Sequence, residues 1–204
     1  MMRVLLVSAH PLSDSLTGQL STKLVQRLEA RGAVVERLDL YAAGFAPALT
    51  AEERRSTYVE PYDASAVTKE IAQLKRAELV VLVFPTWWFG LPAILKGWID
   101  RVWAPGHAYD HASDLGPIKG RLTGLRGLLA VTTLGAPGWV DWLVMRRPVR
   151  RVLRWGVLKV CAPKARFGFA ALYRAEDVTP ARLAVFEARA IRALDRLMDQ
   201  AAAI

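Results

Sequence analysis

Apolar and polar residues divide the chain into short apolar runs separated by longer amphipathic stretches. Short runs rich in Val and Leu predict buried strands; these runs are Arg3–Ser8, Ala33–Leu40, Glu78–Phe84, Gly127–Thr133 and Arg166–Leu172. Stretches in which apolar residues recur every three or four positions predict helices. They are Gly18–Arg31, Ala64–Arg76, Pro92–Trp103, Trp139–Trp155 with a break at Pro148, and Thr179 to about Gln200, with a short helical piece near Ala51–Arg55.

Strands that alternate with helices predict a parallel sheet with helices on both faces. Five strands joined by right-handed crossovers make a doubly wound α/β fold. The chain has no internal repeat and no linker-like tract, so we expect residues 1–204 to form a single domain.

The segment Phe84–Trp103 is unusual because it carries three successive aromatic residues, Trp87, Trp88 and Phe89. Pro85 ends the preceding strand because it cannot donate to a ladder, and Pro92 suits the first turn of the next helix. In an open α/β sheet, a loop that follows a strand in this way lines the ligand crevice. The segment therefore indicates a site for a flat aromatic ligand.

Two other interpretations of this region stay open. The aromatic residues could belong to the core, as a buried strand followed by a buried helix. The uncharged stretch Leu79–Leu95 could also span a membrane, although its 17 residues include two prolines and a spanning helix needs about 20 apolar residues.

Composition narrows the class of protein. Hydrophobic residues make up 53% and charged residues 23% of the 204 positions, which is typical of a folded globular protein. The single cysteine, Cys161, excludes an intramolecular disulfide and fits a reducing cytoplasm, where we expect the protein to act. The net charge of +9 favours anionic partners without choosing among phosphates, nucleotides, lipids and nucleic acid.

Three loops are expected to meet at the carboxyl edge of the sheet, namely His10–Thr17, Pro85–Gly90 and Thr132–Gly138. The first contains three hydroxyl residues, Ser13, Ser15 and Thr17, just before a helix, and such a helix N-terminus binds phosphate. Simple helix capping explains these hydroxyls better than phosphate binding does when they are considered alone. The aromatic and glycine-rich loops suit a flat ring, so together the three loops fit one ligand with two ends.

Several known site motifs are missing from the sequence. There is no G-x-G-x-x-G after the first strand, no phosphate-binding G-x-x-x-x-G-K-[ST] and no G-x-S-x-G nucleophile motif. His107 and His111 have helical metal-ligand spacing, but a third ligand is not evident. We therefore expect no metal site.

Four stretches of the sequence stand out as motifs: VLLVSAHPLSDSLT (4–17), VFPTWWFGLPAILKGWIDRVW (83–103), GHAYD (106–110) and AVTTLGAPG (130–138). Together they resemble the flavodoxin-like NAD(P)H:quinone oxidoreductases, a family that includes DT-diaphorase, the modulators of drug activity and the ancillary oxidoreductases of potassium-efflux antiporters. The resemblance implies a flavodoxin-like sheet in the order 2-1-3-4-5. It also implies a homodimer that binds FAD or FMN, with FAD slightly favoured, and that passes hydride from NAD(P)H through flavin N5 to a quinone in a ping-pong reaction.

The resemblance also assigns roles to individual residues. The flavin phosphates would be held by His10, Ser15, Leu16 and Thr17. The isoalloxazine ring would be lined by Pro85, Thr86, Trp87, Trp88 and Phe89, and its N1–O2 edge would face Thr132, Thr133, Leu134 and Gly135. The residues implied to act in catalysis are Trp88, Phe89, Thr133 and Gly135.

Two departures from the family pattern affect the expected chemistry. DT-diaphorase-like members carry a Tyr and a His after the glycine loop, whereas this chain has Trp139, Val140, Asp141 and Trp142 there, and no histidine after His111. Leu134 also replaces a family glycine. Side-chain assistance with protons is therefore in doubt, and turnover and acceptor range could differ.

Eight basic residues and no acidic residue lie between Trp142 and Phe167. This stretch is open to three interpretations: a solvated helix face, a site for the 2′-phosphate of NADPH, or a surface that rests on an anionic membrane. An alternative function is that of a regulatory subunit of a membrane transporter built on the same fold. A one-electron carrier is disfavoured by the pI of about 10.1, and nucleic-acid binding by the lack of a recognisable reading module.

Overall fold

The computed structural model describes residues 1–59, 61–112, 116 and 118–203. Its centre is a parallel sheet of five strands in the order β2-β1-β3-β6-β7. These strands are β1 (Arg3–Ser8), β2 (Val34–Asp39), β3 (Leu79–Pro85), β6 (Gly127–Leu134) and β7 (Arg166–Tyr173). Counted along the chain the order is 2-1-3-4-5, so the flavodoxin-like doubly wound α/β fold is confirmed.

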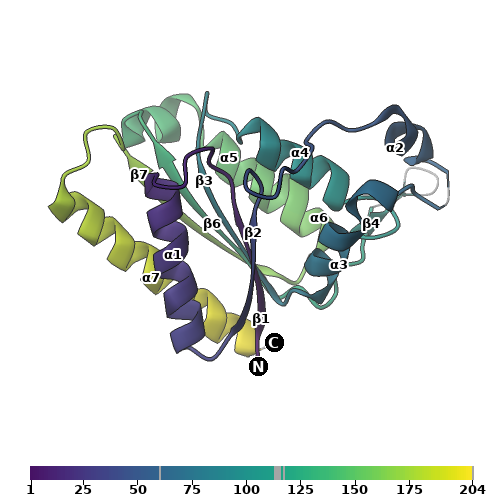
Figure 1. The fold of residues 1–204 in the computed structure, drawn as a ribbon, viewed down its shortest axis with the longest axis horizontal. Helices are drawn as coiled ribbons and strands as arrows, with labels where there is room; N and C mark the ends of the chain where they lie inside the picture. The colour runs from purple at the N-terminus through teal and green to yellow at the C-terminus, as the bar shows by residue number, and fades with distance from the viewer. Residues whose placement is uncertain (60, 113–115, 117, 204) are drawn as a thin grey trace.

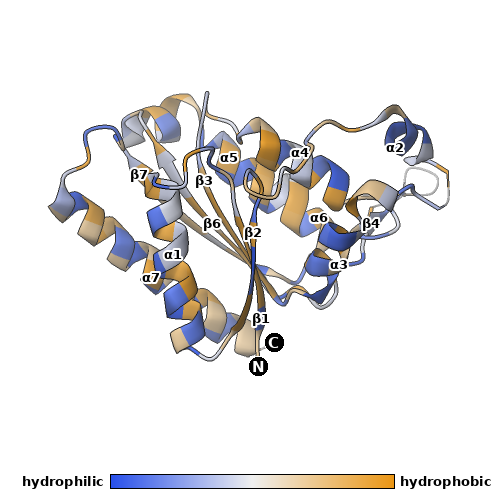
Figure 2. Cartoon of the chain, viewed as in Figure 1, coloured by the Kyte–Doolittle hydropathy of each residue, from blue (hydrophilic) through white to orange (hydrophobic). Residues whose placement is uncertain are grey.

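Helices cover both faces of this sheet (Figure 1). One face packs against α1 (Leu16–Ala30) and α7 (Pro180–Ala202), and the other is covered by α3 (Thr68–Arg76), α4 (Ala93–Val102), α5 (Pro148–Arg151) and α6 (Lys159–Cys161). Successive strand residues point to opposite faces, so Val4 and Leu6 belong to the first core and Leu5 and Val7 to the second. Figure 2 shows these central strands as the most continuously hydrophobic part of the chain.

Shorter elements lie around this framework. They are α2 (Ala51–Ser56), the 3₁₀ turn η1 (Ser65–Val67), the antiparallel pair β4 (Tyr109–Asp110) and β5 (Lys119–Gly120), and the π-helical segments η2 (Val140–Val144) and η3 (Val152–Leu158). The loop predicted over His107–Thr123 therefore contains a short strand pair. Residues 113–115 and 117 of that prediction lie outside the described residues.

A buried ion pair fixes the long loop before α3 onto α4. Arg101 donates to both carboxylate oxygens of Glu53, at 2.7 to 3.0 Å, and both side chains are at most 4% exposed. Glu53 also completes a capping box with Thr50, the N-cap of α2. Gly97 of α4 lies against Pro47, where an added Cβ would come within 2.1 Å of the Pro47 carbonyl oxygen.

Some predicted boundaries were displaced, each for a local reason. The first helix begins at Leu16 instead of Gly18, because Ser15 acts as its N-cap. Pro85 is the last strand residue, paired with Thr133, and does not lie beyond the strand. Pro92 is the N-cap of α4 and not part of its first turn.

The break predicted at Pro148 lies one residue earlier. Arg146 and Arg147 have left-handed φ angles of 56° and 55°, which reverse the chain. Pro148 then starts α5, where its missing N–H is not needed. Helical structure also continues past Trp155, as η3 and α6, to Cys161.

The membrane-span interpretation of Leu79–Leu95 is wrong, because this stretch divides into β3, a turn and the beginning of α4. Across the described ranges, the structure contains no helix with the length and apolarity required to cross a bilayer.

Candidate functional site

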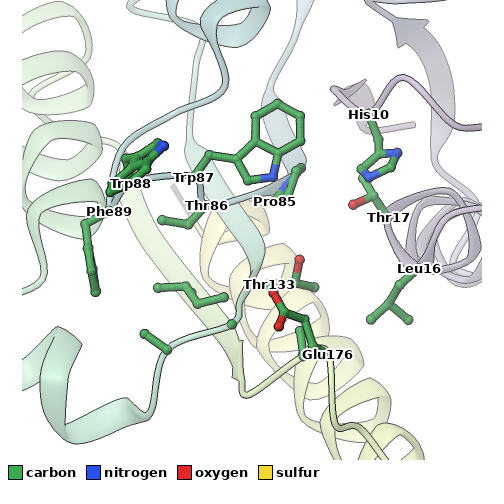
Figure 3. A pocket seen from close by; sticks show the side chains of 14 residues that line it. His10, Leu16, Thr17, Pro85, Thr86, Trp87, Trp88, Phe89, Thr133 and Glu176 are labelled. Atoms are coloured by element: carbon green, nitrogen blue, oxygen red, sulfur yellow. The ribbon is translucent and has the colours of Figure 1, made fainter.

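The loops after β1, β3 and β6 surround one cavity of about 670 Å³. Its walls are formed by His10, Leu16, Thr17, Pro85, Thr86, Trp87, Trp88, Phe89, Thr133, Leu134, Gly135, Ala136, Ala175 and Glu176. Figure 3 shows His10, Leu16 and Thr17 on one side, and Trp88 and Phe89 on the other. The structure thus brings together all of the predicted site residues except two. Ser15 instead caps α1, and the Thr132 hydroxyl lies beside that of Thr86.

The N-terminus of α1 forms the polar end of the cavity. Ser15 accepts a hydrogen bond from the Gly18 N–H at 3.2 Å, so the capping explanation for this hydroxyl is confirmed. The first N–H groups of a helix have no partner within the helix, which leaves those of Leu16 and Thr17 for a ligand. Gly18 is required because an added Cβ would lie 2.4 Å from the Ser13 carbonyl oxygen.

His10 lies between this helix end and the aromatic loop. Its Nδ1 lies 3.0 Å from the Leu12 backbone nitrogen and 3.2 Å from the Leu12 carbonyl oxygen, so this ring nitrogen is engaged by the loop in either tautomer. Its ring centroid is 6.2 Å from that of Trp87. His10 therefore leaves Nε2 for a ligand, between the helix end and the aromatic end of the cavity.

A strained turn presents the aromatic residues. Trp87 and Gly90 exchange backbone hydrogen bonds at 3.3 and 2.8 Å. Between them, Trp88 and Phe89 have φ angles of 51° and 55°, a left-handed conformation that residues other than glycine adopt at a cost. Within the described chain, their N–H groups donate to no protein acceptor. Trp88 is 99% exposed, so its ring is open to solvent in the part of the chain that the structure describes.

Thr132 anchors the aromatic loop although it does not line the cavity. It is 1% exposed, and its hydroxyl lies 2.7 Å from that of Thr86. The Thr86 N–H also donates to the Thr133 carbonyl at 2.7 Å. These two bonds tie the start of the loop after β3 to the end of β6.

Glu176, in the loop after β7, is a cavity residue that the sequence did not reveal. Its carboxylate lies over Gly135, where an added Cβ would be 2.9 Å from Oε1. Backbone bonds from Arg174 to Ala136 and from Ala175 to Leu134 bring the two loops together. The strand order could have indicated this position. Because β7 lies next to β6, the loop that follows β7 leaves the same edge of the sheet as the loop that follows β6.

A polar network lies beside the loop after β6, where the family resemblance led us to expect a Tyr and a His. Tyr173 donates to the buried Asp141 carboxylate at 2.8 Å and accepts from the Trp142 indole N–H at 2.8 Å. Burial raises the pKa of the Tyr173 hydroxyl above its ordinary value. Its ring also packs on Gly138. None of these three residues lines the cavity, so the network braces the loop that does.

The remaining histidines lie elsewhere. His107 and His111 line a second cavity of about 610 Å³, together with Tyr58, Tyr62 and Arg121 among others. His111 Nε2 lies 2.8 Å from the Thr57 carbonyl oxygen, and burial lowers the pKa of His107. Among the described residues, no three His, Cys, Asp or Glu side chains gather as a set of metal ligands.

Comparison with known proteins agrees with this architecture. A family model described as the flavodoxin-like fold matches residues 2–187. The chain is 33% identical to mouse (Mus musculus) ribosyldihydronicotinamide dehydrogenase (quinone) over 192 residues, which are 81% of each chain. It is 36% identical to the Homo sapiens protein of that name over 151 residues, 65% of this chain and 64% of the human one.

A solved structure, the NAD(P)H:quinone oxidoreductase from Methanothermobacter marburgensis, superposes with a TM-score of 0.80 at 25% identity and covers 94% of each chain. The chain belongs to the flavodoxin-like family, and its resemblance to the quinone oxidoreductases of that family is confirmed. It spans 64% of the length of several curated relatives.

Proposed function

We propose that this protein is an NAD(P)H dehydrogenase of the quinone-reducing type and that it binds a flavin noncovalently in the cavity of about 670 Å³. The observation that carries the proposal is the pairing, in one cavity, of a helix N-terminus with a loop of three aromatic residues. When bound, a flavin would supply the two-electron hydride chemistry between NAD(P)H and a quinone, for which we expect ping-pong kinetics.

Different residues of the cavity suit different parts of such a ligand. The N–H groups of Leu16 and Thr17, with His10, suit phosphate oxygens. The N–H groups of Trp88 and Phe89 suit acceptor atoms at the edge of a ring.

The opposite wall is formed by Thr133 and Gly135, whose backbone dipoles would stabilise negative charge near the ring. The exposed Glu176 side chain offers carboxylate oxygens as acceptors, so it suits ligand hydroxyl groups. We propose that the site acts through position and backbone dipoles.

The site also supports a homodimer, as the family resemblance implies. Trp88 is 99% exposed at the rim of the cavity. A neighbouring concavity of about 520 Å³ has apolar side chains, including Leu91, Ile99, Trp103 and Val160. We propose that a second copy covers both, so that each site lies at the interface. Light scattering at micromolar concentration tests this, and a monomer that retains flavin and activity would contradict it.

Purification tests the flavin proposal directly. We expect a yellow protein, and mass analysis of the released ligand will decide between FAD, slightly favoured, and FMN. We expect NADPH or NADH to bleach the absorption band of the bound flavin and a quinone to restore it. Flavin that is bound but never bleached would instead favour the transporter-subunit alternative. A colourless protein that binds no added flavin would refute the site.

A double variant tests the placement of the ring. Trp88→Ala with Phe89→Ala should weaken flavin retention, whereas Trp155→Ala, which changes a 57% exposed Trp outside the cavity, should not. Equal retention by all three proteins would mean that the ring lies elsewhere. We place the reaction in the cytoplasm, in keeping with the single, buried thiol of Cys161.

A further inference from the structure

The chain that leaves the cavity after Gly138 forms an exposed apolar projection. Four of its side chains are more than half exposed: Trp139 at 60%, Trp142 at 54%, Leu143 at 74% and Val144 at 60%. Single exposed apolar residues are ordinary, but a contiguous group marks a surface that contacts something. The group includes η2 and lies at the end of the sheet where the strands terminate (Figure 1).

Five arginines follow this projection: Arg146, Arg147, Arg150, Arg151 and Arg154. Over the ranges that the structure describes, none of them forms an ion pair with a carboxylate. Burial, and then repulsion from Arg147 and Arg154, lowers the pKa of Arg150. The cluster therefore carries positive charge that the protein itself does not neutralise.

The backbone brings the two groups side by side. The left-handed φ angles of Arg146 and Arg147 turn the chain back after η2. The Arg147 guanidinium consequently stacks on the Trp142 ring, at 4.3 Å from its centroid. Arg147 thus joins the apolar side chains to the arginine cluster, and we name the four apolar residues and the five arginines together the Trp139–Arg154 surface, after its first and last members.

We propose that the Trp139–Arg154 surface binds the face of a lipid bilayer that contains anionic headgroups. Exposed Trp, Leu and Val suit the headgroup boundary, and unpaired arginines suit lipid phosphates. A second copy of this chain fits less well, because a two-fold contact of the patch with itself would double the unneutralised charge. The proposal goes beyond flavin chemistry and does not depend on it.

Co-sedimentation with vesicles of pure phosphatidylcholine, or of phosphatidylcholine with one third phosphatidylglycerol, tests the proposal. We expect binding to the anionic vesicles only, weakened by salt. Arg146→Gln with Arg151→Gln should lower the partition coefficient roughly 25-fold, because each basic residue near an anionic surface strengthens binding about fivefold. Leu143→Ser with Val144→Ser should lower it about tenfold or more.

A matched control removes one exposed apolar and one exposed basic residue from α7, as Val185→Ser with Arg192→Gln. It should bind like the unchanged protein. Three results would overturn the proposal: no binding to either vesicle, equal loss in the control, or unchanged binding in both surface variants. Light scattering and binding of a labelled oligonucleotide are measured on the same variants. If the surface variants bind vesicles normally but no longer form dimers, the surface contacts a second copy of the chain. If they bind vesicles normally but lose binding to the oligonucleotide, the surface contacts nucleic acid.

Discussion

The turn at Trp88 leads to a prediction in which stability and ligand binding move in opposite directions. Trp88 has a φ of 51° and a side chain that is 99% exposed. Its ring therefore adds almost nothing to the stability of the flavin-free protein, while its backbone conformation costs free energy. Trp88→Ala removes the ring and keeps the conformational cost, whereas Trp88→Gly removes both.

The structure sets the size of each effect. Trp88→Ala should change the free energy of unfolding by less than about 0.5 kcal/mol, as expected for an exposed side chain. Trp88→Gly should be more stable than Trp88→Ala by about 1 kcal/mol, because an alanine is disfavoured at positive φ. Both variants should lose about 1–3 kcal/mol of flavin binding, the usual contribution of an aromatic side chain stacked on a ring.

Urea unfolding of the flavin-free variants and fluorescence titration with flavin measure the two quantities. The pair Val185→Ala and Val185→Gly, at an exposed position within α7, is the control. There the order should invert, with alanine about 1 kcal/mol more stable than glycine. If Trp88→Gly is less stable than Trp88→Ala, the turn is not strained; if either variant binds flavin normally, Trp88 does not contact the ring.

Three further predictions concern buried groups. Thr132→Val should destabilise the protein by about 1–2 kcal/mol in urea unfolding and weaken flavin binding, because it leaves the Thr86 hydroxyl unpartnered, while Thr132→Ser should do neither. Arg101→Met should lower the free energy of unfolding by about 3–5 kcal/mol, because it leaves the Glu53 carboxylate buried without its partner. The double variant Arg101→Met with Glu53→Gln should recover part of that stability. An unchanged free energy of unfolding in Arg101→Met would mean that the ion pair is solvated. Burial raises the pKa of Cys161 from 9.0 to about 12, so between pH 9 and 12 the thiol ionises only in the unfolded protein. The free energy of unfolding should therefore fall with pH more steeply than in Cys161→Ala, by roughly 1.4 kcal/mol per pH unit. Equal slopes in the two proteins would contradict this prediction.

The fold was predictable because each face of the sheet is specified by alternate residues of the same strands. In β3, Val80 and Leu82 pack into one core, and Leu79 and Val81 pack into the other. Strands buried on both faces appear in the sequence as continuous apolar runs, and these are hard to mistake. Helix ends were less predictable because they depend on single capping contacts, as at Ser15.

The sequence predicted the site residues in loops that directly follow a strand. It predicted less well the residues whose orientation or position depends on tertiary contacts. Thr132 and Thr133 are adjacent in a motif, but only the sheet shows that Thr132 faces inward to Thr86 while Thr133 lines the cavity. Glu176 escaped notice because it belongs to no aromatic, hydroxyl or glycine motif. It reaches the cavity only because β7 pairs with β6.

Under the proposed function, the strained turn and the polar network position the site in the absence of the Tyr and His that the family resemblance implies. Trp88 and Phe89 hold a sparsely populated conformation, and among the described residues their N–H groups have no protein acceptor; such strain is typical of ligand-contacting positions. On the opposite wall, Tyr173 and Asp141 brace the glycine loop without entering the cavity. Both devices fix backbone groups in place, so under the proposed function this chain would contribute position and electrostatics, and we expect proton exchange to involve solvent and substrate.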